Sequence, residues 1–217
     1  MTTLIDRQVQ IEGLSASAPQ TLPFAPSLSI RAFALERAGG NLAIYSVDGL
    51  ASDPAIAESG EIIRHFLNHR HEAMFAAEPL DAPLFVHERD RALVAETLPV
   101  RGGFNKRFML DDDFEVIPTP GHTPGATAFL WASDGHRMLF TGDSLYLDDG
   151  EWVAAVLESS DRRAYIESLE LIRDLDFDVL VPWAASEDQP FLNLVDEDEK
   201  GSRIDAIIAR VRNGQNR

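Results

Sequence analysis

Two histidines, His69 and His71, stand at a spacing that suits metal binding. They follow a short apolar segment, residues 62–67, which we expect to form a buried strand. On an extended chain the side chains of residues i and i+2 point to the same side, so both imidazoles can reach one ion. Taken alone, the pair fits equally well with two surface histidines at the end of a strand.

A third histidine, His122, lies in a loop whose composition restrains its side chain. Residues 118–125 contain three prolines and two glycines, which exclude a helix and favour tight turns. The loop follows a predicted strand, residues 114–117. Asp143 follows another predicted strand, residues 137–140, which places its carboxylate at the rim of a sheet. By itself, Asp143 fits a turn or cap residue better than a metal ligand.

The elements that must position these side chains alternate between strands and helices. Residues 29–48 predict a hairpin, whereas residues 15–29, rich in Ser, Ala and Pro, predict irregular chain. Further strands are predicted at 62–67, 84–86, 114–117, 126–131, 137–140 and 179–181. Helices are predicted at 52–59 with Ser52 as N-cap, at 88–98, after Ser160 as N-cap, and near the C-terminus. This mixture predicts α/β layers, with helices covering the faces of the sheets.

Length and composition fit one globular domain. The chain has 217 residues, of which 45% are hydrophobic, so it can bury a core without disulfide bonds. We expect a single domain over 1–217, with an N-terminal extension at 1–28 and an amphipathic helix at 200–217. The sequence contains no cysteine, which excludes disulfides, thiolate ligands and a cysteine nucleophile.

The excess of acidic over basic residues argues against several classes of binding partner. The formal net charge is -17, so nucleic acid and anionic membranes would be repelled. We therefore expect a small-molecule substrate, with neither nucleic acid nor membrane as a partner. No apolar run approaches the roughly 18 residues of a transmembrane helix, and no secretory signal is visible, so we expect a cytoplasmic location. The oligomeric state stays open.

Together, these segments resemble the metallo-β-lactamase superfamily. The resemblance spans nearly the whole chain, from the hairpin and the histidine pair through residues 120–125 and 141–144 to the helix before the last strand. It implies an αβ/βα four-layer sandwich with a metal site at one edge. On this resemblance, His69, His71 and His122 match the first metal site, and Asp143 matches the bridging aspartate.

The chain departs from the family pattern at the second metal site. The family motif is usually Thr-His-x-His-x-Asp-His, and here Ala73 and Met74 occupy the positions of the aspartate and the final histidine. The family's last histidine is also missing, because residues 183–185 read Trp-Ala-Ala. We therefore expect one zinc or iron ion, or none, since three imidazoles with a carboxylate or water complete a tetrahedral shell. Trp183 either fills the space of the second metal or is an ordinary core residue.

Three functions remain open from the sequence. The resemblance implies a hydrolase of esters, thioesters, amides or lactones. In the family, the aspartate at the position of Ala73 orients the attacking water, and this chain lacks that aspartate. No obvious base replaces it, because we expect Glu72 to point away from His69 and His71 on extended chain. The alternative is a non-catalytic protein that keeps the fold with a degraded metal site. A lesser alternative is an iron enzyme similar to persulfide dioxygenases, with His69, His122 and Asp143 as a two-histidine, one-carboxylate set.

Overall fold

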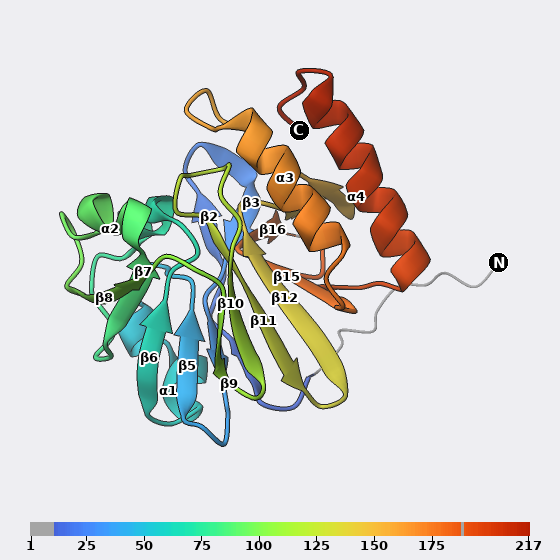
Figure 1. Cartoon of the computed structure of the whole chain (residues 1–217). Coiled ribbons are helices and arrows are strands. Elements are labelled where there is room, and N and C mark those ends of the chain that lie inside the picture. Colours follow the sequence, from blue (N-terminus) through green and yellow to red (C-terminus); the bar gives the residue numbers. More distant parts are fainter. Residues whose placement is uncertain (1–10, 188) are drawn as a thin grey trace.

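Two β-sheets lie face to face in the middle of the molecule (Figure 1). The structure is a computed structural model and describes residues 11–187 and 189–217. In the first sheet, β1, β4 and β5 pair antiparallel, and β5 to β8 pair parallel. Its strands, in spatial order, are β1 (Leu14–Ala16), β4 (Phe33–Leu35), β5 (Asn41–Ile44), β6 (Ile62–Phe66), β7 (Leu84–His87) and β8 (Val100–Phe104).

The second sheet is antiparallel except for the parallel pair of β12 and β15. Its strands, in spatial order, are β17 (Asn193–Leu194), β15 (Val179–Pro182), β12 (His136–Gly142), β11 (Thr127–Ser133), β10 (Phe114–Pro118) and β9 (Phe108–Asp111). A smaller third sheet contains β14 (Glu151–Val153), β13 (Tyr146–Asp148), β16 (Ala184–Ser186), β3 (Ala25–Ile30) and β2 (Gln20–Leu22). The chain passes from β3 to β4 and from β15 to β16, which connects this sheet to both others.

Helices cover the outer faces of the two large sheets. The helical elements are η1 (Leu50–Ser52), α1 (Pro54–Glu58), η2 (Arg70–Phe75), α2 (Glu88–Val94), α3 (Arg162–Arg173) and α4 (Glu197–Arg212). The apolar faces of α3 and α4 pack with the second sheet, and Val94 of α2 packs with Leu84 and Val86 of β7 (Figure 1). These layers confirm the predicted αβ/βα four-layer sandwich. None of the helices in the described ranges has both the length and the apolar character to cross a lipid bilayer.

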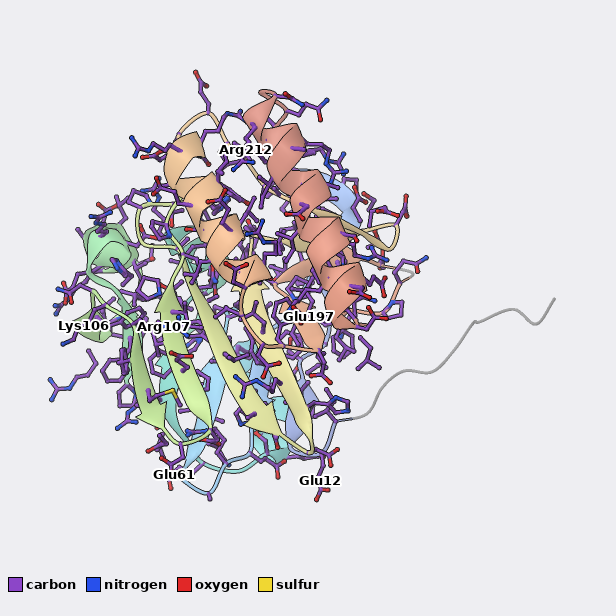
Figure 2. The ribbon with its side chains drawn as sticks, turned by 45° about the vertical axis from the view of Figure 1, so that its right-hand side comes forward. Glu12, Glu61, Lys106, Arg107, Glu197 and Arg212 are labelled. Carbon is purple, nitrogen blue, oxygen red and sulfur yellow. The ribbon has the colours of Figure 1, made fainter. Side chains whose placement is uncertain are left out.

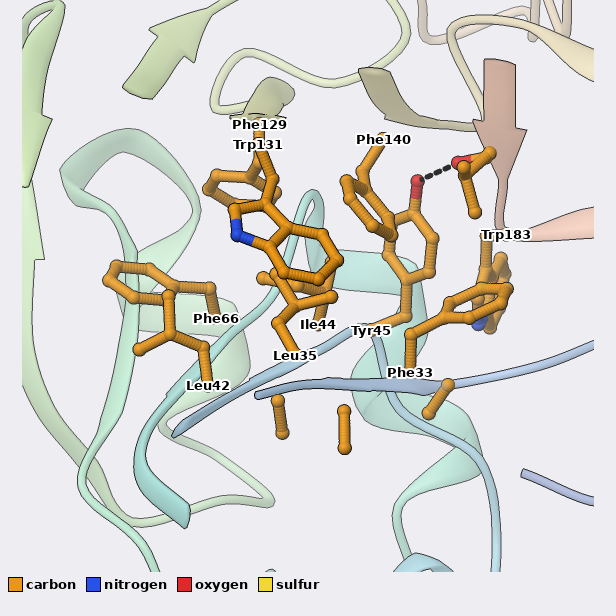
Figure 3. Packing of buried hydrophobic residues seen from close by; sticks show 14 of the residues in the cluster. Phe33, Leu35, Leu42, Ile44, Tyr45, Phe66, Phe129, Trp131, Phe140 and Trp183 are labelled. Atoms are coloured by element: carbon orange, nitrogen blue, oxygen red, sulfur yellow. Dashed lines mark hydrogen bonds between the residues drawn. The ribbon is translucent and has the colours of Figure 1, made fainter. Parts of the chain in front are cut away.

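The main core lies between the two large sheets. Rings from both sheets meet there, and Phe33 of β4 lies against Phe140 of β12 with centroids 5.8 Å apart (Figure 3). Tyr45, directly after β5, donates a hydrogen bond to the carbonyl of Val181 at 2.8 Å (Figure 3). Charged side chains instead surround the sandwich, as Glu61, Lys106 and Arg212 illustrate (Figure 2). The apolar pattern of the strands therefore fixes which face of each sheet is internal.

The prediction of irregular chain over residues 15–29 is wrong. β1 pairs with β4, and β3 lies between β2 and β16, so residues 14–28 contribute to two of the sheets. The sheet tolerates proline in this segment because the register between β2 and β3 shifts at Thr21/Leu22. The regular pattern of backbone hydrogen bonds between these two strands is interrupted there. The hairpin predicted over 29–48 is shorter than expected, since only β4 and β5 form it.

The helices agree with the predicted periodicity, but their boundaries differ. Tyr165, Leu169 and Ile172 are buried on α3 as the sequence pattern predicts. The predicted N-caps are wrong by one residue: Asp53 caps α1 and Asp161 caps α3, each accepting hydrogen bonds from two backbone N–H groups. The helix predicted over 200–217 runs instead from Glu197 to Arg212.

Candidate metal centre

Four residues from separate segments meet at one edge of the sandwich. His69 follows β6, His71 lies in η2, His122 lies in the loop after β10, and Asp143 follows β12. Each of these segments begins where a strand ends, and the strand ends lie at the same edge. One potential ligand atom from each residue lies within 4.8 Å of the other three. The structure thus brings together all four residues that the sequence singled out.

The distances in this cluster fit a single ion. Nδ1 of His71 lies 3.0 Å from Nε2 of His122. Oδ2 of Asp143 lies 3.4 Å from Nε2 of His69 and 3.5 Å from Nε2 of His122. Two nitrogens that each lie about 2.0–2.1 Å from a tetrahedral zinc are roughly 3.3 Å apart, so these separations are of the right size. Nε2 of His69 is buried and makes no hydrogen bond with any residue in the described ranges, which also fits a role as a metal ligand.

The segment after β6 does not continue as extended chain. His69 is extended, with φ -154° and ψ 166°, but η2 begins at Arg70, so the predicted i, i+2 geometry is wrong. His71 reaches the cluster from the first turn of this helix instead. The prediction that Glu72 points away from His69 is also wrong, because Oε1 of Glu72 lies 3.1 Å from Nδ1 of His69. The turn brings Glu72 back toward the start of the helix, which strand alternation could not indicate.

The loop that carries His122 is held by α3. Gly121 has φ +146°, and a Cβ atom there would lie 2.3 Å from Cα of Tyr165, so a glycine is needed. The backbone N–H of Asp161 donates to the carbonyl of Gly121, and the hydroxyl of Ser168 donates to the carbonyl of Pro120. Nδ1 of His122 lies 2.7 Å from the carbonyl of Ala155 and donates to it, which leaves Nε2 as the lone-pair nitrogen.

Asp143 is positioned by two buried tyrosines. Gly142, with φ +55°, donates its N–H to the hydroxyl of Tyr45 at 2.7 Å. The hydroxyl of Tyr165 lies 3.0 Å from the carbonyl of Asp143 and 2.8 Å from that of Ser144. Both hydroxyls contact the backbone on either side of the carboxylate. The side chain of Asp143 is therefore directed by a well-held strand end, and it stays partly exposed.

Asp90 is a buried residue that the sequence reasoning missed. Its carboxylate accepts from the N–H of Arg70 at 3.1 Å, from the hydroxyl of Thr123 at 2.6 Å and from the N–H of Gly125 at 3.1 Å. It therefore connects the segment of His69 and His71 to the loop of His122. No local pattern in α2 indicates this role, because all three donors lie far from Asp90 in sequence.

Two of the histidines are neutral in the ordinary pH range. Burial, together with the nearby His69 and His122, lowers the pKa of His71 to about 3. Burial also lowers the pKa of His122 to about 4, although Asp143 opposes this effect. A neutral imidazole has a free lone pair, which is the form that binds metal ions. Both side chains are therefore ready to act as ligands near pH 7.

The pKa values of His69 and Asp143 are both shifted toward the charged form of the side chain. Burial lowers the pKa of His69, but the carboxylates of Asp143 and Glu72 outweigh burial and raise the pKa to about 10. Burial raises the pKa of Asp143, but His69 and then His122 and His71 outweigh it and lower the pKa to about 2. This edge of the sandwich thus favours a positive charge between two carboxylates, and a metal cation would satisfy the same preference.

The positions of the family's second metal site are apolar. Ala73 is buried, and Met74 is 65% exposed. Trp183 is buried with its ring centroid 5.3 Å from that of His69 and 5.5 Å from that of Phe75, and its Nε1 donates to the carbonyl of Ser46. Trp183 therefore belongs to the core and also lies against the cluster. Within residues 11–187 and 189–217, His69, His71, His122 and Asp143 form the one group suited to hold a metal ion.

Comparison with known proteins agrees with this architecture. The family model described as "Metallo-beta-lactamase superfamily" matches residues 51–184, a span that includes all four residues of the cluster. A search of curated proteins finds no match.

Solved structures share the fold at low sequence identity. A metallo-beta-lactamase from Pontibacter korlensis is 15% identical with a TM-score of 0.66, covering 94% of this chain and 98% of that one. A metallo-beta-lactamase from Hirschia baltica is 14% identical with a TM-score of 0.66, covering 92% and 96%. An archaeal superfamily protein from Sulfolobus tokodaii is 15% identical with a TM-score of 0.60, covering 94% and 96%. At such identities the likeness concerns the fold alone.

Proposed function

The chain belongs to the metallo-β-lactamase superfamily, and from that premise we propose that it is a metal-dependent hydrolase with a site for one metal ion. Its substrate, on this proposal, is a small molecule with an ester, thioester, amide or lactone bond. The observation that carries the proposal is the convergence of three imidazoles and one carboxylate, whose ligand atoms lie within 4.8 Å of one another.

The donor set favours zinc. Nε2 of His69, Nδ1 of His71 and Nε2 of His122 would supply three nitrogen ligands, and Oδ2 of Asp143 an oxygen ligand. When bound, such an ion supplies Lewis acidity, which polarises a substrate carbonyl and makes water a stronger acid. Iron is the second choice, because two histidines and one carboxylate are also an iron-binding set.

The chain's own residues prepare the site for this chemistry. The carbonyl of Ala155 accepts the Nδ1 proton of His122 and so keeps Nε2 free. The negative charge of Asp143 offsets the charge of a cation. Trp183 packs on His69 and helps to keep that ring out of solvent. Ala73 provides no proton acceptor where the family has an aspartate, so the proposal assigns no general base there.

Two other functions compete with this proposal. The apolar side chains at positions 73 and 74 favour a protein that keeps the fold but performs no catalysis. The contacts of Asp143 with His69 and His122 form a two-histidine, one-carboxylate set that suits iron, which favours, more weakly, an iron enzyme. Its substrate would be a persulfide, as the resemblance implies. The metal content of the protein separates all three.

We would measure zinc and iron by elemental analysis of protein purified without chelator or added metal. The same samples would be assayed on an ester, a thioester, an amide and a lactone, before and after metal removal and zinc addition. One zinc per chain with chelator-sensitive hydrolysis would support the proposal, with His122→Ala as the inactive control. Iron with oxygen-dependent loss of a persulfide would support the iron enzyme. A metal-free, chelator-insensitive protein would support the non-catalytic alternative, and two ions per chain would contradict the single-ion site.

A further inference from the structure

Glu72 is a buried carboxylate that accepts hydrogen bonds from the segment that carries the first histidine. The residue is fully buried. Its Oε1 accepts hydrogen bonds from the backbone N–H of Asn68 at 2.8 Å and from that of His69 at 2.9 Å. Oε2 has no hydrogen-bond partner among the residues that the structure describes. A buried carboxylate is costly, so its retention here calls for a further partner.

The ring of His69 lies beside this carboxylate. Nδ1 of His69 lies 3.1 Å from Oε1 of Glu72, although the contact is bent away from the axis of the N–H bond. Nε2, on the other side of the ring, faces Oδ2 of Asp143 at 3.4 Å. The two nitrogens of His69 therefore face different groups: Nδ1 faces a carboxylate inside the fold, and Nε2 faces the metal cluster.

His122 shows the same division between its two nitrogens. Its Nδ1 donates to the carbonyl of Ala155 at 2.7 Å, and its Nε2 lies in the cluster. A neutral imidazole carries one proton, so an acceptor at Nδ1 leaves the lone pair on Nε2. Metal-binding histidines generally donate their other N–H to a carboxylate, a carbonyl or water.

We propose that Glu72 is a positioning residue for His69: it accepts the Nδ1 proton, fixes the ring's tautomer and orientation, and so presents Nε2 to a metal ion. The role follows from this chain's own geometry, since η2 turns the carboxylate back onto the backbone of Asn68 and His69. The inference rests on the proposed metal centre, but it does not depend on hydrolysis.

The first test is zinc affinity, measured by competition with a chelator of known affinity. Glu72→Ala removes the acceptor, and we expect zinc binding to weaken roughly 10–100-fold, the usual effect of losing such a partner. Glu72→Gln keeps an oxygen of similar position and should recover part of the loss. Asp113→Asn is the matched control, because Asp113 binds Arg37 and Trp131 just before β10, at the opposite end of that strand from the loop of His122. Wild-type affinity in folded Glu72→Ala, or an equal loss in Asp113→Asn, would overturn the proposal.

The second test needs no variant and no activity. Nitrogen-15 NMR of the histidine rings reports which nitrogen of His69 carries a proton. We expect a proton on Nδ1 of His69 both without metal and with zinc, and a changed Nδ1 signal in Glu72→Gln. A proton on Nε2 alone in the wild-type protein would refute the role of Glu72.

The outcomes separate this inference from the proposed function. Zinc binding without hydrolysis would contradict the hydrolase and leave the role of Glu72 intact. If wild-type protein binds no zinc, the metal centre fails, and the Nδ1–H signal of His69 in the metal-free protein, compared with that in Glu72→Gln, still decides whether Glu72 accepts the Nδ1 proton. If Glu72→Ala does not fold, the wild-type spectrum and Glu72→Gln decide.

Discussion

His122 is the residue whose replacement tests the metal centre most directly. It is 1% exposed, and its Nε2 lies among the potential ligand atoms. An ion that binds only the folded state stabilises it by mass action. We therefore expect a chelator to lower the melting temperature of wild-type protein and to leave that of His122→Ala nearly unchanged. Differential scanning calorimetry with and without chelator measures both effects.

The metal-free forms of the two proteins are the reference for this chelator experiment. Without metal, His122→Ala removes packing and the hydrogen bonds to Ala155 and His71, which typically costs about 0.5–3 kcal/mol. If chelator changes the melting temperature of neither protein, the four residues do not bind metal under those conditions, and the proposed hydrolase is contradicted.

His65 predicts a loss of stability in weak acid that is independent of the metal centre. It is buried on β6, and its Nε2 lies 2.6 Å from the carbonyl of Tyr45. Burial lowers its pKa from 6.5 to about 4. Between these values the unfolded chain binds a proton that the folded chain does not, so the free energy of unfolding decreases as the pH falls. The loss is complete near pH 4 and amounts to roughly 3 kcal/mol.

The measurement compares wild type with His65→Gln, which retains an N–H donor toward Tyr45 but does not titrate. Urea unfolding at several pH values should give a shallower slope between pH 6.5 and pH 4 for the variant. Other titrating groups contribute equally to both proteins, so the difference isolates His65. Parallel pH profiles for the two proteins would show that His65 is not buried in its neutral form.

At the scale of elements, the packing of α3 on the loop of His122 depends on one glycine. A Cβ atom at Gly121 would lie 2.3 Å from Cα of Tyr165, and the φ of +146° is unfavourable for any other residue. We expect Gly121→Ala to push α3 away and to destabilise the protein by more than about 2 kcal/mol. Urea unfolding with a constant m-value is the measurement.

Gly201 is the matched control for that substitution. It lies inside α4, and a Cβ atom there would meet nothing within 4 Å. Alanine is a better helix former than glycine, so Gly201→Ala should stabilise the protein by about 0.5–1 kcal/mol. Opposite signs for the two glycine-to-alanine substitutions would support the close approach of α3 and the loop. Equal effects would contradict it.

For the whole molecule, the net charge of -17 predicts that salt stabilises the fold. Like charges on a compact surface repel one another, and added salt shortens the range of that repulsion from about 10 Å at 0.1 M to about 3 Å at 1 M. Relief of about 1 kcal/mol would raise the melting temperature by roughly 2–4 °C in a chain of this size. Thermal unfolding in increasing sodium chloride, without divalent ions, measures the effect.

A variant with less charge provides the control. Glu61 and Glu96 are exposed, and replacing both with Lys changes the net charge from -17 to -13, because each substitution replaces -1 with +1. The variant should show a smaller rise in melting temperature over the same salt range. An unchanged rise would mean that the salt effect arises from surface tension or ion binding and not from the net charge.

The sequence alone was sufficient for the features that depend on short segments. The apolar periodicity of α3, the turn-rich loop around His122 and the histidine pair after β6 each follow from neighbouring residues. The superfamily's layer order also followed from these motifs in their order along the chain. The absence of an ionisable side chain at Ala73 can be read directly from the sequence.

Tertiary structure decided the features that depend on residues far apart. β1 and β3 form because their backbone groups find partners in β4 and β16, not because residues 15–29 favour strands. Asp90 holds two distant loops, and its own surroundings in α2 contain no sign of this. Glu72 faces His69 only because the chain leaves the extended conformation at Arg70. Local sequence patterns determine the secondary-structure propensity of a segment and the spacing of its side chains. The hydrogen-bond partner of a backbone N–H or of a buried carboxylate depends instead on how the whole chain packs.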